Sequence, residues 1–173
     1  MATETQNPAI KDSGSQCCWS VDDGNAPAKV GDVMNMLLAD VFTLYFKTKR
    51  FRWHISGLHF REYRLLLNEQ AEQLIATADA IAERVRKIDR GTLKSLQHIA
   101  RLARLSGNEV DFVAPLLMLA ELRSDSALLA GYMRDVHSVC EGVDDLASMS
   151  MLEDWIDQAE ERVWFLFECG RAA

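Results

Sequence analysis

The sequence predicts an all-α fold, an antiparallel four-helix bundle with a short extra helix between the second and third long helices. About half of the 173 residues are apolar, which is typical of a globular protein. Only three prolines and nine glycines interrupt the chain. Apolar residues recur at the spacing of one helix face over four long segments. A chain of this length forms one domain with a sizeable core.

Residues 1–28 are polar and show no periodicity, so we expect a flexible tail followed by one helical domain over 29–173. The tail contains Cys17 and Cys18, whose role the sequence leaves open. The first helix is expected over 29–56, because Met34, Leu37, Leu38, Val41 and Leu44 share one face. Gly57 is a typical stop signal.

The second helix is expected over 60–88. Its apolar stripe consists of Leu67, Ala71, Leu74, Ala78, Ile81, Val85 and Ile88, and Gly91 follows it. A short amphipathic helix is expected over 93–105. A third long helix, over 111–139, tolerates Pro115 in its first turn, and a fourth spans 144–170. Helices of this length reach about 40 Å and pair as a bundle.

Charge and hydropathy exclude several function classes. The net charge of −7 argues against general affinity for nucleic acid, because binding phosphates requires many cationic side chains. We expect no membrane association, because no apolar run approaches the ~20 residues of a membrane span. The N-terminus lacks the pattern of a signal peptide, and we therefore expect a cytoplasmic protein.

Asp79 and Glu83 lie one helical turn apart and therefore share a face. Two like charges at this spacing repel each other unless a cation lies near them. The spacing fits two interpretations, a metal site and a solvated face in which Glu83 pairs with Lys87. The chain has no Glu-x-x-His motif, which argues against a di-iron site held within one subunit.

Arg52 and Arg64 lie close to the apolar stripes of the first two helices. Either they reach water at the helix ends, or they pair with acidic residues of another subunit. His54 and His59 flank the turn at Gly57, and two ligands alone are a weak indication of a metal site.

Three segments carry a resemblance to a known family. The string TKRFRWHISGLHF over 48–60, with Arg64 and Asn68 after it, is followed by TADAIAERVRKI over 77–88 and WIDQAEERVWFLFE over 155–168. Together they resemble the Dps family of small ferritin-like proteins, over about 29–169. The resemblance implies a ferritin-like bundle, a dodecameric homo-oligomer, and oxidation of ferrous iron with storage of the ferric product.

In that family the ferroxidase site lies between two subunits. One subunit supplies a histidine before the tryptophan, a second histidine twelve residues later and an aspartate four residues after that. The other supplies the aspartate and glutamate of a D-x3-E pair. Here the pair is intact as Asp79 and Glu83, but Arg52, Arg64 and Asn68 occupy the other three positions.

A guanidinium has no lone pair to donate to iron. The resemblance therefore implies an impaired ferroxidase site, in which Arg52 and Arg64 of one subunit form interface salt bridges with Asp79 and Glu83 of the next. Two functions stay open. The first is a cage for iron storage and oxidative-stress protection. The second is a ferroxidase-inactive structural cage, or a DNA-protecting subunit, that co-assembles with a catalytic paralogue. DNA binding by this chain itself is expected to be weak, and enzyme activity stays open.

Other positions are candidates for binding iron outside that site. Glu69 and Glu72 are candidates for mineral nucleation inside a cage. Asp144 and Asp145 are candidates for a pore lining, and His54 and His59 for a displaced metal site.

Overall fold

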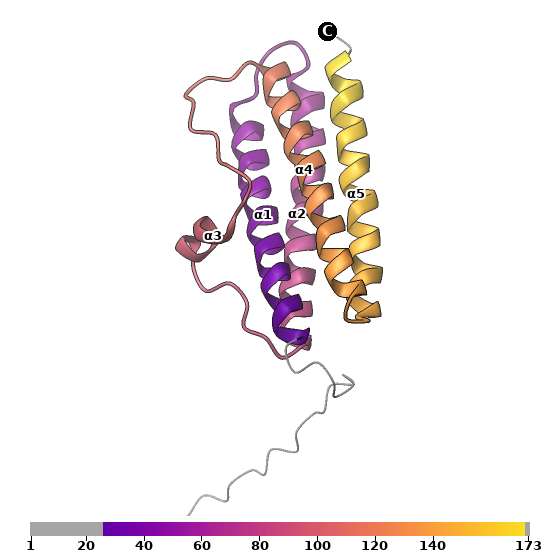
Figure 1. Ribbon diagram of the computed structural model, residues 1–173. Coiled ribbons are helices and arrows are strands. Elements are labelled where there is room, and N and C mark those ends of the chain that lie inside the picture. The colour runs from indigo at the N-terminus through magenta and orange to yellow at the C-terminus, as the bar shows by residue number, and fades with distance from the viewer. Residues whose placement is uncertain (1–25, 172–173) are drawn as a thin grey trace, which may run out of the picture.

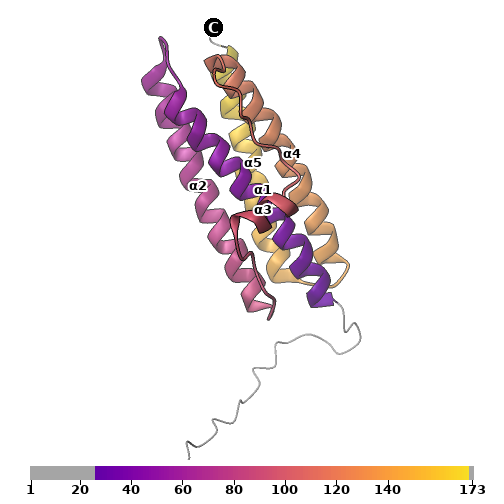
Figure 2. The same ribbon diagram turned by 90° about the vertical axis from the view of Figure 1, so that its left-hand side faces the viewer.

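The structure is a computed structural model that describes residues 26–171. Its elements are α1 (Ala26–His54), α2 (Phe60–Lys87), α3 (Leu96–Leu102), α4 (Pro115–Glu141) and α5 (Leu146–Arg171). The four long helices run side by side as a bundle in which α1 and α2, and likewise α4 and α5, are antiparallel (Figure 1). The short α3 lies against the outer side of α1 (Figure 2). The predicted all-α bundle is confirmed for these residues.

The core is built from the apolar stripe of each long helix. The predicted stripe of the second helix is buried, with no member more than 3% exposed: Leu67, Ala71, Leu74, Ala78, Ile81 and Val85 on α2, and Ile88 directly after it. Equivalent stripes come from α1, α4 and α5. Within 26–171 no helix is both long and apolar enough to cross a membrane.

The ends of α1 differ slightly from the prediction. The helix begins at Ala26, so residues 26–28 belong to it and not to the expected tail. The rest of that expected tail, with Cys17 and Cys18, lies outside the described residues. The helix ends at His54, and Gly57 adopts a φ of 103° in the turn that follows. A glycine adopts this left-handed conformation without steric cost.

The connection from α2 to α4 holds less helix than predicted. Instead of 93–105, α3 spans only Leu96–Leu102, and the Ser95 hydroxyl caps it by accepting from the His98 amide at 3.1 Å. Instead of residue 111, α4 begins at Pro115. Proline disfavours the helical conformation in the residue before it, and Ala114 is extended with a ψ of 144°.

At the start of α5 the Asp145 carboxylate caps the helix. It accepts from the Ser148 amide at 3.1 Å and from the Ser148 hydroxyl at 2.5 Å. The helix therefore begins at Leu146 and not at residue 144.

Two buried ion pairs fasten other elements to α1. The fully buried Asp40 carboxylate accepts from the Arg104 amide at 2.6 Å, from Arg104 Nε at 2.8 Å and from the Leu105 amide at 3.0 Å. Lys47 Nζ lies 2.6 Å from Asp125 Oδ2 and 2.9 Å from Glu121 Oε1 on α4. The sequence analysis missed both. The sequence signal for them was a charged residue on the apolar face of the first helix, Asp40, followed seven residues later by a second one, Lys47.

Candidate metal and subunit interface site

Asp79 and Glu83 are exposed on the outer surface of α2. Glu83 Oε2 accepts from Lys87 Nζ at 3.0 Å, so the salt-bridged interpretation is confirmed for this residue. In contrast, the Asp79 carboxylate has no hydrogen bond or ion pair with any residue of 26–171. One acid of the pair is therefore still without a counter-charge.

Asp79 borders an open hollow of about 410 Å³ between α1 and α2. The remaining lining is apolar: Phe42, Ile75, Ala76, Ala78 and Ala82. A second open hollow of about 450 Å³ adjoins Glu83. A carboxylate bordered mainly by apolar side chains is poorly stabilised if the hollow is closed off from water, so covering this surface requires a cation beside Asp79.

Arg52 and Arg64 lie together near the other end of α2, on either side of the turn at Gly57. Arg64 Nη1 lies 3.4 Å from the Arg52 carbonyl oxygen, and the Arg64 guanidinium lies 5.8 Å from the centre of the Phe60 ring. Arg52 Nε is buried and has no hydrogen-bond partner in the described chain. Neither arginine forms an ion pair within 26–171.

The third replaced position, Asn68, contacts its own helix. Its Nδ2 donates to Glu72 Oε1 at 2.6 Å. Glu69 and Glu72 are both exposed, and their role in mineral nucleation stays a prediction.

A single chain does not bring the arginines and the acids together. Arg64 and Asp79 are fifteen residues apart on one helix, which corresponds to about 22 Å. Among the described residues, no group of three or more histidine, cysteine, aspartate or glutamate side chains is arranged to hold a metal ion. Within 26–171, a single chain therefore holds no complete metal site on this surface.

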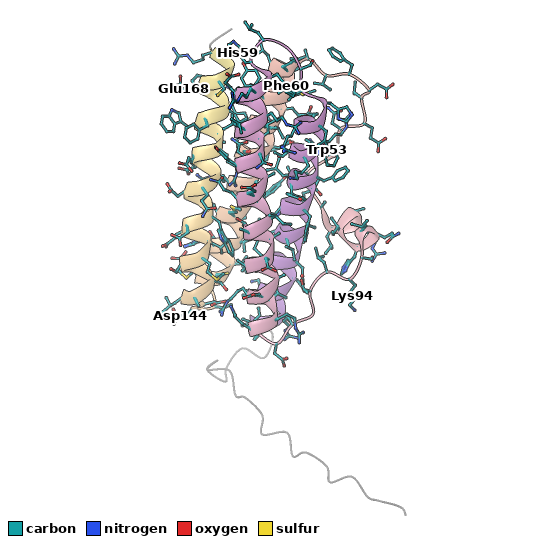
Figure 3. All side chains as sticks on the ribbon, turned by 180° about the vertical axis from the view of Figure 1, so that it is seen from behind. Trp53, His59, Phe60, Lys94, Asp144 and Glu168 are labelled. Atoms are coloured by element: carbon teal, nitrogen blue, oxygen red, sulfur yellow. The ribbon has the colours of Figure 1, made fainter. Side chains whose placement is uncertain are left out.

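The two histidines near Gly57 do not converge on a metal-binding position in this chain. His54 Nδ1 lies 2.8 Å from the Arg50 carbonyl oxygen, and the His59 ring lies 5.6 Å from the Tyr63 ring. His59 and Phe60 lie at one end of the bundle, with Trp53 on its flank (Figure 3). A displaced site at His54 and His59 stays a prediction, because nothing here completes it.

The predicted pore residues differ in their surroundings. Asp144 is exposed at the end of the bundle opposite His59 (Figure 3). Asp145 is only 4% exposed, and its carboxylate lies 2.5 Å from Arg84 Nη2. Because this ion pair and the α5 cap occupy the Asp145 carboxylate, we retain only Asp144 as a candidate for a pore lining.

Large apolar side chains are exposed near the acids and the arginines. Phe46 is 61% exposed and Trp53 is 55% exposed, and their rings meet edge to face at 6.2 Å. Beside them, an open groove of about 450 Å³ runs between α1 and the α3 segment, lined in part by Phe42, Phe46 and Leu96. Exposed apolar surface of this kind marks an interaction surface. The sequence analysis did not identify it, because a stripe pattern does not show which apolar residues face outward.

Comparison with known proteins gives one consistent result. The ferritin-like domain family matches residues 32–169. A low temperature-induced protein of Nostoc sp. is 32% identical over 136 residues, which cover 78% of this chain and 76% of that protein. A DNA protection during starvation protein of Halobacterium salinarum is 27% identical over 133 residues, covering 75% and 71% of the two chains.

Among solved structures, Dps from Vibrio cholerae O1 superimposes with a TM-score of 0.80 at 23% identity, covering 84% of this chain and 91% of that one. That protein is described as a member of a broad superfamily of ferritin-like diiron-carboxylate proteins. At this identity the likeness supports the fold alone.

Proposed function

Because this chain belongs to the Dps family of ferritin-like proteins, we propose that it assembles into a dodecameric cage that stores iron and protects against oxidative stress. Its inter-subunit ferroxidase site is impaired. Ferrous iron is the substrate and cargo of such a cage. The cage is cytoplasmic, and its subunits are copies of this one chain.

The proposed impairment follows from the residues at the site. Iron binding needs lone pairs from neutral imidazoles and carboxylates. At these positions the chain offers the permanently protonated guanidinium groups of Arg52 and Arg64, together with the neutral amide of Asn68. Only Asp79 and Glu83 retain the chemistry of a metal ligand.

The observation that carries the proposal is the complementary charge on the α1–α2 surface. Among the residues of 26–171, Arg52 and Arg64 lie near one end of α2 without acidic partners, and Asp79 lies fifteen residues after Arg64 without a cation. In a two-fold symmetric pair each surface contacts its own copy, so every cross-subunit contact occurs twice. An antiparallel arrangement of two α2 helices places Arg64 opposite Asp79 at both ends.

The surroundings of these charges support the same arrangement. The hollow beside Asp79 and the exposed Phe46 and Trp53 supply apolar area that a second subunit covers. Covering it removes water from the charges, which strengthens the attraction between guanidinium and carboxylate. The fork of an arginine can then satisfy both oxygens of a carboxylate where a metal ion would otherwise bind.

Ferrous oxidation tests the impairment directly. The absorbance of the ferric product is followed after adding ferrous iron with peroxide, and separately with oxygen. We expect the natural chain to add little to the buffer rate. We expect the triple variant Arg52→His, Arg64→His, Asn68→Asp to oxidise iron faster by at least ~10-fold, because it restores the ligand set that the family resemblance implies.

A matched control keeps the number of new histidines and places them elsewhere. Lys49→His with Arg61→His changes two nearby cations outside the proposed site, and this variant should behave like the natural chain. Rapid oxidation by the natural chain, at the rate of the triple variant, would show that the site is not impaired. A triple variant that stays slow would show that these three residues are not the cause.

A further inference from the structure

Arg162 on α5 is a buried cation without a partner in the described chain. Its side chain is 2% exposed, and its Nε, Nη1 and Nη2 atoms are all buried without a hydrogen bond. Burial lowers the pKa of its guanidinium from its ordinary value to about 10, and the exposed neighbour Glu161 acts in the opposite direction. The group therefore remains charged at neutral pH. A buried charge with unmet hydrogen-bond donors is costly unless something compensates it.

The register of α5 against α2 follows from two observed contacts. Tyr63 Oη lies 3.5 Å from the Cys169 carbonyl oxygen at one end, and Arg84 Nε lies 2.8 Å from Ser148 Oγ at the other. In each pair the two residue numbers have the same sum. This is expected for antiparallel helices whose side chains face each other at seven-residue steps. The same steps place Gln70 opposite Arg162, and the two helices lie side by side (Figure 3).

Gln70 presents a second unmet donor at this level. Its side chain is 4% exposed, and its Nε2 is buried without a partner in the described chain. The nearby Gln73 has a buried Oε1 that is likewise unpaired. If the side-chain amide of either glutamine were flipped, so that its oxygen and nitrogen exchanged places, the guanidinium could meet a neutral oxygen. It would not neutralise the charge, and one amide oxygen cannot satisfy five N–H groups.

We propose that Arg162 and Gln70 bind a small monovalent anion, such as chloride, inside the bundle between α2 and α5. The donors come from two facing helices, as in a built binding site. One negative charge matches the one buried cation, whereas a doubly charged oxyanion would replace one uncompensated charge with another. The anion fastens α5 to α2 between the two observed hydrogen-bonded pairs, one step from the Tyr63–Cys169 pair and two steps from the Arg84–Ser148 pair.

Thermal unfolding at constant ionic strength, with gluconate replaced stepwise by chloride, tests the proposal on the full chain. A ligand that binds only the folded state raises Tm with its concentration, by about 3 °C per tenfold once the site is nearly saturated. We expect this rise in the natural chain and its loss in Arg162→Met. The control Arg134→Met changes an exposed arginine on α4 and should keep the rise. A rise of equal size in Arg162→Met would overturn the proposal.

Crystals of the natural chain grown in bromide give a second readout, which does not depend on whether Arg162→Met folds. We expect an anomalous bromide peak within hydrogen-bond distance of the Arg162 guanidinium and the Gln70 amide. An ordered water or an amide oxygen at that place, with no anomalous signal, would contradict the proposal.

Discussion

Arg52 and Arg64 give their positions a chemistry that differs from that of the histidines implied by the family resemblance. An imidazole can lose its proton and bind a metal, whereas a guanidinium remains protonated at every working pH. A site that contains two such groups attracts carboxylates and repels cations. At the scale of the residue, this difference is the basis of the proposed loss of ferroxidase chemistry.

Cys140 gives a prediction about pH. Burial, with a smaller contribution from Asp145, raises the pKa of its thiol from 9.0 to about 11. The folded state therefore holds this proton more tightly than the unfolded state, so the stabilisation is complete below pH 9 and is lost as the pH rises through 11. We expect the stability of the natural chain relative to Cys140→Ala to fall by about 2 kcal/mol between pH 8.5 and 11.

Urea unfolding of both proteins across this range measures that difference. The cost of the cavity left by the alanine is the same at each pH and cancels from the trend. A difference that stays constant with pH would show that the Cys140 thiol does not titrate differently in the two states.

Residues that share the helix periodicity were predictable, and residues that break it were not. The α2 stripe from Leu67 to Val85 is buried as expected. The sequence analysis identified Arg52 and Arg64 because charges beside an apolar stripe need partners. It did not identify Asp40, Lys47 or Arg162, since a pattern that assigns charges to the surface cannot show which of them are buried.

At the scale of the element, α2 carries three separate faces. One is the apolar stripe in the core. A second faces α5 with polar residues at seven-residue steps: Tyr63, Gln70, Thr77 and Arg84. The third is the outer surface with Asp79 and Glu83. One helix thus contributes to the core, to the polar contact with α5 and to the proposed subunit interface.

Asp40, like Asn35 and Arg50, is an α1 residue whose side chain attaches the segment from α2 to α4 to α1. Its carboxylate accepts three hydrogen bonds from Arg104 and Leu105, and the Arg104 guanidinium lies 3.8 Å from the centre of the Tyr132 ring on α4. We expect Asp40→Ala to destabilise the chain by about 3–5 kcal/mol, because it leaves a partly buried cation and two amides without their partner.

Urea unfolding measures the loss, and hydrogen exchange should show faster exchange over residues 88–114. The control Asp32→Ala removes an exposed carboxylate from the same helix and should change stability little. Equal effects of the two substitutions would mean that the contacts of Asp40 do not hold this segment.

The ends of the elements were less predictable than their existence. Pro115 fits both a helix that starts at residue 111 and one that starts at the proline, and only the extended Ala114 decides between them. In the same way, the sequence does not show that Asp145 is the residue that caps α5, because the neighbouring Asp144 has the same side chain.

At the scale of the whole molecule, charge governs which partners approach. The formal charge of −7 per chain gives 12 × −7 = −84 for a dodecamer. Such a field attracts cations and repels polyanions. It therefore fits a cage that gathers iron and does not bind nucleic acid through its general surface.

A gel shift with duplex DNA tests that consequence. We expect no shift at physiological salt, because the chain lacks the excess of cationic side chains needed to release counter-ions from DNA. A Dps protein known to bind DNA serves as the positive control under the same conditions. A shift that persists at physiological salt would mean that a local basic segment overrides the net charge.

The proposed assembly depends on a contact in which Arg64 of one subunit pairs with Asp79 of the next. Native mass spectrometry of a charge-swap set tests it most directly, with the natural chain expected as twelve copies of 19.5 kDa. Arg64→Asp alone and Asp79→Arg alone place like charges opposite each other, and we expect each to weaken assembly by at least about 100-fold. The double variant should restore the dodecamer, and Arg61→Asp should leave it intact. Single variants that assemble as well as the natural chain, or a double variant no better than either, would show that Arg64 and Asp79 do not pair between subunits.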